Sequence, residues 1–151
     1  MKRRTFIKKN AIVTLAPFIT TGLLARNKKI KSLSEKPFQL NYAPHFGMFE
    51  SMAGKDLMDQ IQFMHDQGFR SLEDNGMKNR SKKTQNDIAK KMEKLGMGMG
   101  VFVGHKIYWK VPNLTSGDKS LQDEFVENIR DSIEVAKRVN ATWMTIVPGH
   151  I

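Results

Sequence analysis

The chain has 151 residues, enough for one ordinary domain, and its 40% hydrophobic and 26% charged residues are typical of a globular protein. It contains no cysteine, which excludes disulfides, a thiol nucleophile and thiolate metal sites. The net charge of +10 would suit a nucleic-acid binder, but residues 1–36 hold ten Lys/Arg against one acidic residue. Residues 37–151 hold fifteen against fourteen, so the body is nearly neutral and we expect no nucleic-acid partner.

The first 25 residues have the pattern of an export signal. A cationic start precedes an apolar run, 11–25, that is shorter than the about 20 apolar residues of a membrane span. Residues 3–8 read RRTFIK, which resembles the twin-arginine motif. We expect export to the periplasm by the twin-arginine machinery, a linker over 26–37, and membrane contact only through the leader. Leu23 is bulky where a cleavage site has a small residue, so the alternative is an uncleaved leader that anchors the protein in the membrane.

From residue 38 onward, strand and helix patterns alternate. Short apolar runs bounded by Gly or Pro predict strands over 38–43, 69–73, 97–103 and 142–147. Apolar residues at steps of three and four predict helices over 56–67, 81–94 and 120–139. Ser81 is the expected N-cap of the second helix, and Gly68 and Gly96 are expected to end the first two. This order predicts successive βαβ units with right-handed crossovers.

The polar residues that follow the strands favour one of two possible α/β folds. Periodicity alone fits both a doubly wound sheet and an eight-stranded barrel. A dinucleotide-binding fold needs a glycine fingerprint after the first strand, where this chain reads PHFGMF at 44–49. The glycines at 96, 98 and 100 precede and enter the third strand, so they are interpreted as a helix stop and small interior residues. Barrel enzymes carry their active sites where strands end, and polar residues stand there after all four strands: Asn41, His45, Glu73 to Asn75, His105 and His150. We therefore predict an α/β fold over 38–151 that forms the N-terminal half of a (β/α)8 TIM barrel.

Four stretches resemble the hydroxypyruvate isomerase-like group of the sugar isomerase/epimerase barrels. They are LNYAPHFGMF at 40–49, QGFRSLEDNGM at 67–77, LGMGMGVFVGH at 95–105 and AKRVNATWMTIVPG at 136–149. The resemblance implies an intramolecular oxidoreductase, an aldose–ketose isomerase acting on a small sugar or hydroxy-keto acid. In that family two glutamates move a proton through an enediol(ate), and a divalent metal such as Mg or Mn stabilises the developing charge.

The same resemblance places the metal-binding carboxylates and the second glutamate on strands five to eight. The catalytic residues are therefore expected after Ile151, and no metal ligand is assigned within the chain. By this interpretation the 151 residues are a fragment of the barrel and are inactive alone.

Four residues at the predicted strand ends are candidates for substrate binding. Glu73 can hydrogen-bond substrate hydroxyls, or it is a solvated loop acid. His105 can contact substrate or, as in related metal-dependent endonuclease barrels, a metal; alternatively the backbone satisfies it. His45 contacts substrate or shapes a turn, and Trp109 walls the pocket or only covers the barrel mouth. His150 is a weaker candidate. Six methionines are interpreted as flexible packing: Met58, Met64, Met92, Met97, Met99 and Met144.

Two other functions compete with the isomerase. One is a metal-dependent endonuclease of the same superfamily, against which the nearly neutral body counts. The other is an exported, non-catalytic sugar-binding barrel protein, which an uncleaved leader would suit. Glutamates at the ends of strands five and eight would favour catalysis, and their absence would favour binding.

Overall fold

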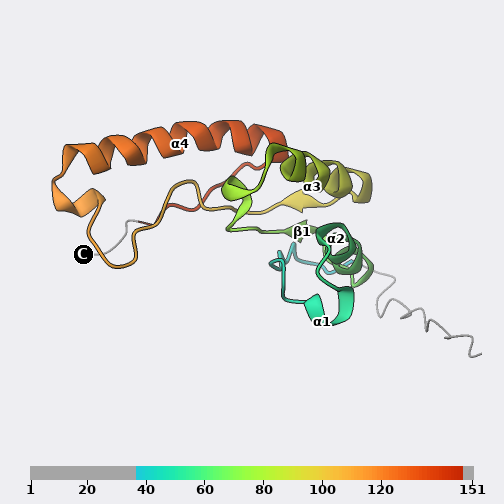
Figure 1. The fold of residues 1–151 in the computed structure, drawn as a ribbon. Coiled ribbons are helices and arrows are strands. Elements are labelled where there is room, and N and C mark those ends of the chain that lie inside the picture. The colour runs from blue at the N-terminus through green and yellow to red at the C-terminus, as the bar shows by residue number, and fades with distance from the viewer. Residues whose placement is uncertain (1–36, 148–151) are drawn as a thin grey trace, which may run out of the picture.

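The computed structural model of the chain describes residues 37–147, and these form a mixed α/β fold (Figure 1). The predicted leader, nearly all of the linker and His150 lie outside the described residues. The elements in chain order are α1 (Glu50–Ala53), α2 (Leu57–Asp66), β1 (Ser71–Leu72), the 3-10 helix η2 (Met77–Asn79), α3 (Lys82–Leu95), β2 (Gly98–Met99), the 3-10 helix η3 (Leu114–Ser116) and α4 (Lys119–Val139).

The three long helices begin and end at the residues that the sequence marks. The side chains of Asp56, Ser81 and Asp118 accept hydrogen bonds from the first-turn amides of α2, α3 and α4. Gly96 ends α3 in the left-handed region at φ 64°, and Asn140 ends α4 in the same way at φ 53°. The predicted helices over 56–67, 81–94 and 120–139 are therefore confirmed, with ends that shift by one residue.

Four segments of the chain pair side by side, all parallel and in sequence order. Leu72 of β1 pairs with Met99 of β2 in a two-stranded sheet. Isolated bridges extend this pairing on both sides: His45 to Glu73, Met99 to Ala141, and Val103 to Thr145. The segment at 44–45 thus lies next to 71–73, which lies next to 98–103, which lies next to 141–145. This is the order that consecutive βα units produce.

The second and third predicted strands are much shorter in the structure, and the first and fourth are wrong. Residues 142–147 form no strand, because only Thr145 makes an isolated bridge there. Residues 38–43 form no strand: the amide of Tyr42 donates to the carbonyl of Leu40 at 3.0 Å, inside the same segment. The Phe38 amide donates to the Gly68 carbonyl at 3.0 Å, and the segment at 71–73 is reached at Pro44 and His45, where the Glu73 amide donates to the Pro44 carbonyl at 3.2 Å. Pro44 has no amide hydrogen, so this edge has one donor fewer to extend the ladder.

A one-residue irregularity interrupts the pairing in the third segment. The amide of Gly100 donates to the Leu72 carbonyl at 2.8 Å, but the amide of Asp74 then donates to Val101 at 3.2 Å rather than to residue 100. One extra residue is therefore accommodated on this side, as in a β-bulge. It explains why Met99 and Phe102, three positions apart, both pack against the core.

The core lies between the helices and one side of the strand segments. Helix α2 packs on α3 and α3 packs on α4, so the helices follow each other around that side (Figure 1). The buried apolar residues are Ile61, Met64, Leu72, Met77, Ile88, Met92, Met97, Phe102, Val135 and Val139. Met58, Met99 and Met144 pack against them, so the interpretation of the six methionines as packing residues is confirmed. By strand alternation, Glu73, Val103 and Thr145 lie on the other side.

Candidate functional site

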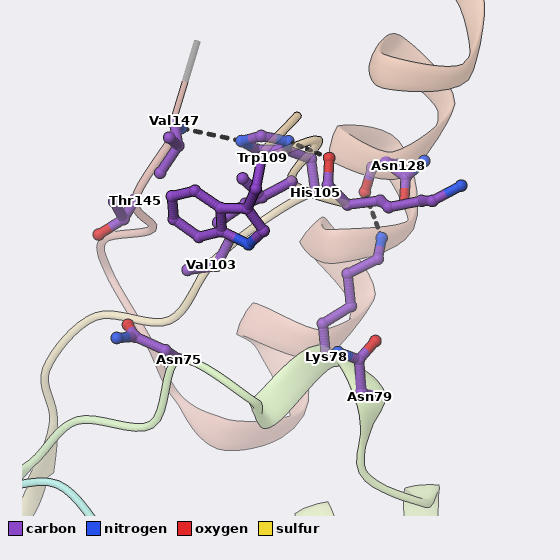
Figure 2. A pocket seen from close by; sticks show the side chains of 11 residues that line it. Asn75, Lys78, Asn79, Val103, His105, Trp109, Asn128, Thr145 and Val147 are labelled. Atoms are coloured by element: carbon purple, nitrogen blue, oxygen red, sulfur yellow. Dashed lines mark hydrogen bonds between the residues drawn. The ribbon is translucent and has the colours of Figure 1, made fainter. Parts of the chain in front are cut away.

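A cavity of about 650 Å³ lies where the third and fourth strand segments end (Figure 2). The chain after β1, the loop after residue 103, helix α4 and the last described residues all contribute to its wall. The lining residues are Asn75, Lys78, Asn79, Val103, His105, Lys106, Ile107, Trp109, Asn128, Thr145 and Val147. Val103 and Thr145 are bridge partners, so the cavity begins at the carboxyl ends of paired strands.

His105 is a buried member of this wall, and both of its ring nitrogens are engaged. Its Nε2 accepts from the amide of Val147 at 2.8 Å, which requires Nδ1 to carry the hydrogen that it donates to the Lys106 carbonyl at 2.8 Å (Figure 2). The ring also packs on Phe125 of α4, with centroids 4.9 Å apart. In this arrangement the neutral imidazole holds the fourth segment against the third, and neither nitrogen is open to a ligand or a metal.

Lys78 reaches the cavity from η2 and is anchored on α4. Its ammonium donates to the carbonyl of Asn128 at 2.6 Å and to the hydroxyl of Ser132 at 3.1 Å. Burial lowers the pKa of Lys78 below its ordinary value, and the negative charge of Asp131 partly opposes this effect. Ser132 is fully buried and also contacts the carbonyl of Gly104 at 2.5 Å, so it joins α4 to the third strand segment.

A second polar network fixes the loop that follows His105. Lys106 donates to the Tyr108 hydroxyl at 2.7 Å, and that hydroxyl donates to Glu124 of α4 at 2.7 Å. The hydrogen bond from Tyr108 and the nearby charge of Lys106 lower the pKa of Glu124. Trp109, next in the chain, is 72% exposed, so the loop presents its indole at the open rim of the cavity.

Glu73 and His45 form a pair of their own, beside the cavity rather than in its wall. The imidazole Nε2 of His45 contacts a carboxylate oxygen of Glu73, and the two residues are also backbone bridge partners. Their side chains are 35% and 26% exposed, so both remain accessible to a small molecule. A Cβ placed on Gly100 would lie 3.2 Å from the Leu72 carbonyl and 3.4 Å from the Cβ of Glu73, so this glycine allows the segments to approach closely next to the pair.

An ion pair between Asp74 and Arg80 shapes the chain from Asn75 to Asn79, which lines the cavity. Asp74 is buried; its carboxylate accepts from Arg80 Nε at 2.5 Å and from the Gly76 amide at 3.1 Å. The guanidinium of Arg80 also lies 5.0 Å from the ring centroid of Phe46, in the loop after the first segment. The two loops are therefore held together around one cation.

Two of the four predicted site residues, His105 and Trp109, line the cavity, and the other two form the neighbouring pair. Sequence reasoning named Asn75 among the strand-end polar residues without choosing it as a site residue, and it missed five other polar or charged lining residues: Lys78, Asn79, Lys106, Asn128 and Thr145. Asn75 carried a signal, because it directly follows the second strand. Lys78 and Asn128 carried none, because they meet only through the packing of η2 on α4, 50 residues apart.

The described residues do not by themselves provide a metal site. Within residues 37–147, no three His, Cys, Asp or Glu side chains are grouped so that they could hold an ion. The described cavity wall has no carboxylate, and hard divalent cations prefer carboxylate and carbonyl oxygens.

Among residues 37–147, no helix combines the length and apolar character needed to cross a bilayer.

Comparisons with protein-family models, with curated proteins and with solved structures give no match to this chain.

Proposed function

We propose that the chain is the first half of a (β/α)8 barrel that acts, when whole, as an aldose–ketose isomerase of hydroxypyruvate isomerase type, and that this half alone is inactive. One observation carries the proposal: four parallel segments pair in sequence order, and the cavity and the His45–Glu73 pair lie at their carboxyl ends. That end of a parallel βα array is where barrel enzymes bind their substrates. The resemblance of the four strand-end stretches supplies the reaction class.

In this proposal the described residues bind and orient a small sugar or hydroxy-keto acid. Val103, Ile107 and Trp109 provide apolar walls, while three asparagines and Thr145 provide hydrogen-bond partners for hydroxyl and carbonyl groups. Glu73 and His45 are accessible, and they contact substrate from the neighbouring position. The resemblance also implies two proton-transferring glutamates and a divalent metal. In this proposal those glutamates and the metal ligands lie outside residues 37–147.

The proposal also covers location. The leader is proposed to direct the protein to the periplasm through the twin-arginine machinery, with the membrane contacted only through that leader. Fractionation of cells with intact and Arg3→Lys/Arg4→Lys leaders tests this. The double variant should stay in the cytoplasm, whereas periplasmic recovery of the variant would contradict twin-arginine export.

The activity is tested on the full gene product with hydroxypyruvate in D₂O. Conversion to tartronate semialdehyde, followed by proton NMR, should incorporate solvent deuterium at carbon, because an enediol(ate) exchanges its proton with the medium. Chelation of divalent metal should abolish turnover, and Mn²⁺ or Mg²⁺ should restore it. Binding without conversion would instead favour an exported sugar-binding protein. If neither occurs with this acid or with small aldoses, the proposal is wrong.

A further inference from the structure

The charged residues that are described in the cavity wall all carry positive charge. Among its described lining residues are two cations, Lys78 and Lys106, and no aspartate or glutamate. Three side-chain amides and one hydroxyl add neutral hydrogen-bonding groups: Asn75, Asn79, Asn128 and Thr145. A partly enclosed wall of this composition attracts an anion, because charges are screened less there than in bulk water.

The two lysines differ in how their charge is balanced. Lys106 lies 3.5 Å from a carboxylate oxygen of Glu124, and its nitrogen also lies 4.4 Å from the ring centroid of Tyr108. A carboxylate on its own network therefore balances its charge. Lys78 instead donates to two neutral oxygens, those of Asn128 and Ser132. An ammonium has three N–H groups, so one remains for a ligand.

The position of Lys78 is fixed before any ligand arrives. The contacts with Asn128 and Ser132 hold its nitrogen on α4, at the wall of the cavity that Trp109 also lines (Figure 2). Asp131 acts on Lys78 electrostatically, but no ion pair joins Lys78 to any carboxylate in the part of the chain that the structure describes. A cation that is already positioned and lacks a carboxylate partner loses little on binding an anion.

We propose that Lys78 determines specificity by binding the acidic group of the substrate, so that the cavity selects small hydroxy acids over neutral sugars. This inference rests on the proposed function for the use of the site, and it decides between the two substrate classes that the resemblance leaves open. A carboxylate and a phosphate share the chemistry that an ammonium recognises. The experiment below therefore distinguishes them.

The test measures binding, not turnover, on the full gene product. This chain has two tryptophans, Trp109 and Trp143. The exposed Trp143 is replaced by phenylalanine (Trp143→Phe), so that Trp109 is the tryptophan of this chain that reports on the cavity. Its fluorescence is titrated with three ligands of equal carbon number: glycerate, glycerol 3-phosphate and glycerol. At least one anion should bind tenfold or more tightly than glycerol, and the tighter of the two identifies the acidic group.

Variants at two lysines then assign the preference. Lys78→Met keeps the aliphatic stem and should reduce anion affinity at least tenfold while leaving glycerol affinity within twofold. Lys82→Met is the matched control, an exposed lysine four positions along that does not line the cavity, and should bind like the parent. A salt series on the parent covers the case in which Lys78→Met does not fold. Raising NaCl from about 20 to about 500 mM should weaken the binding of the anion and leave the binding of glycerol unchanged.

Equal affinity for the anions and glycerol, or no binding of any of the three, would overturn the inference. So would a Lys78→Met protein that folds and binds anions like Lys82→Met. Turnover separates this result from the proposed function. If the Trp109 signal depends on Lys78 but no isomerisation occurs, the inference stands and the isomerase proposal fails. If hydroxypyruvate is isomerised with the same KM by Lys78→Met, the isomerase proposal stands and the inference fails.

Discussion

Ser132 is a single buried hydroxyl that connects three parts of the molecule. It contacts the carbonyl of Gly104 at 2.5 Å, the carbonyl of Asn128 at 2.9 Å and the ammonium of Lys78 at 3.1 Å. Ser132→Ala leaves the Gly104 carbonyl buried without this partner, which costs about 1–3 kcal/mol of unfolding free energy. Urea denaturation measures the loss. Ser51→Ala, at an exposed helical serine, is the control and should change stability by less than about 0.5 kcal/mol.

Glu124 offers a test of the network that fixes the Trp109 loop. The hydrogen bond from Tyr108 is the largest cause that lowers its pKa, followed by the charge of Lys106. Tyr108→Phe removes the donor, so the pKa of Glu124 should rise toward its ordinary value. Carboxyl chemical shifts in an NMR pH titration report this directly. An unchanged pKa would show that the hydrogen bond from Tyr108 is not what lowers it.

The sign of the associated pH dependence follows from the lowered pKa. A carboxyl group whose pKa is lower in the folded state stabilises the protein above its unfolded pKa. That contribution is lost as the pH falls through the folded pKa. The Tyr108→Phe protein should therefore lose less stability than the parent on acidification through this range.

At the scale of single elements, helix α3 shows what local sequence can specify. Ser81 was predicted as its N-cap, and the Ser81 hydroxyl accepts from the Thr84 amide at 3.1 Å. Ser81→Ala should lower the free energy of unfolding by about 1 kcal/mol, whereas Ser81→Asp should retain most of it. Thermal and urea unfolding of both variants decide the matter. Equal losses in the two would show that the side-chain contact is not what stabilises this end.

The helices were predictable from sequence because the information that fixes them is local. A cap, an apolar stripe and a left-handed glycine such as Gly96 all lie within the helix or directly beside it. The strands were not predictable to the same degree. Whether Phe38 to Ala43 form a ladder depends on donors and acceptors of a neighbour about 30 residues away, and Tyr42 satisfies its amide locally instead. The irregularity at Gly100 has the same origin, because only the carbonyl of Leu72 and the amide of Asp74 define it.

The candidate site divides along the same line. Residues that directly follow strands, such as Glu73 and His105, could be selected by position in the chain. Their actual partners could not: the His105 ring meets the Val147 amide 42 residues later, and Lys78 meets α4. Side chains contributed by a packed neighbour carry no periodic signal of their own. Sequence reasoning therefore selected the end of the strands at which the cavity lies, and it missed both lysines of the cavity wall, Lys78 and Lys106.

At the scale of the whole molecule, the position of the cavity depends on the sequential parallel order of the four segments. Because the chain has no cysteine, pairs of introduced cysteines can test that order. Val103 and Thr145 are bridge partners whose side chains line the same cavity. Adjacent strands bring paired Cα atoms to within about 4.4–6.8 Å, the range that a disulfide spans. Val103→Cys/Thr145→Cys should therefore oxidise to an intramolecular disulfide. Its formation removes two hydrogens, seen as a mass loss of about 2 Da, and gives faster migration in a denaturing gel without reductant.

A second pair supplies the contrast that makes this order falsifiable. His45 and Thr145 belong to the first and fourth segments, which two intervening segments separate. Neighbouring strands are about 4.8 Å apart, so three spacings place these positions beyond the reach of a disulfide. His45→Cys/Thr145→Cys should remain reduced within the monomer under the same oxidant. If the distant pair closes efficiently and the adjacent one does not, the four segments do not follow sequence order. The cavity at their carboxyl ends would then be assembled differently, and the roles given to Lys78 and His105 would fail with it.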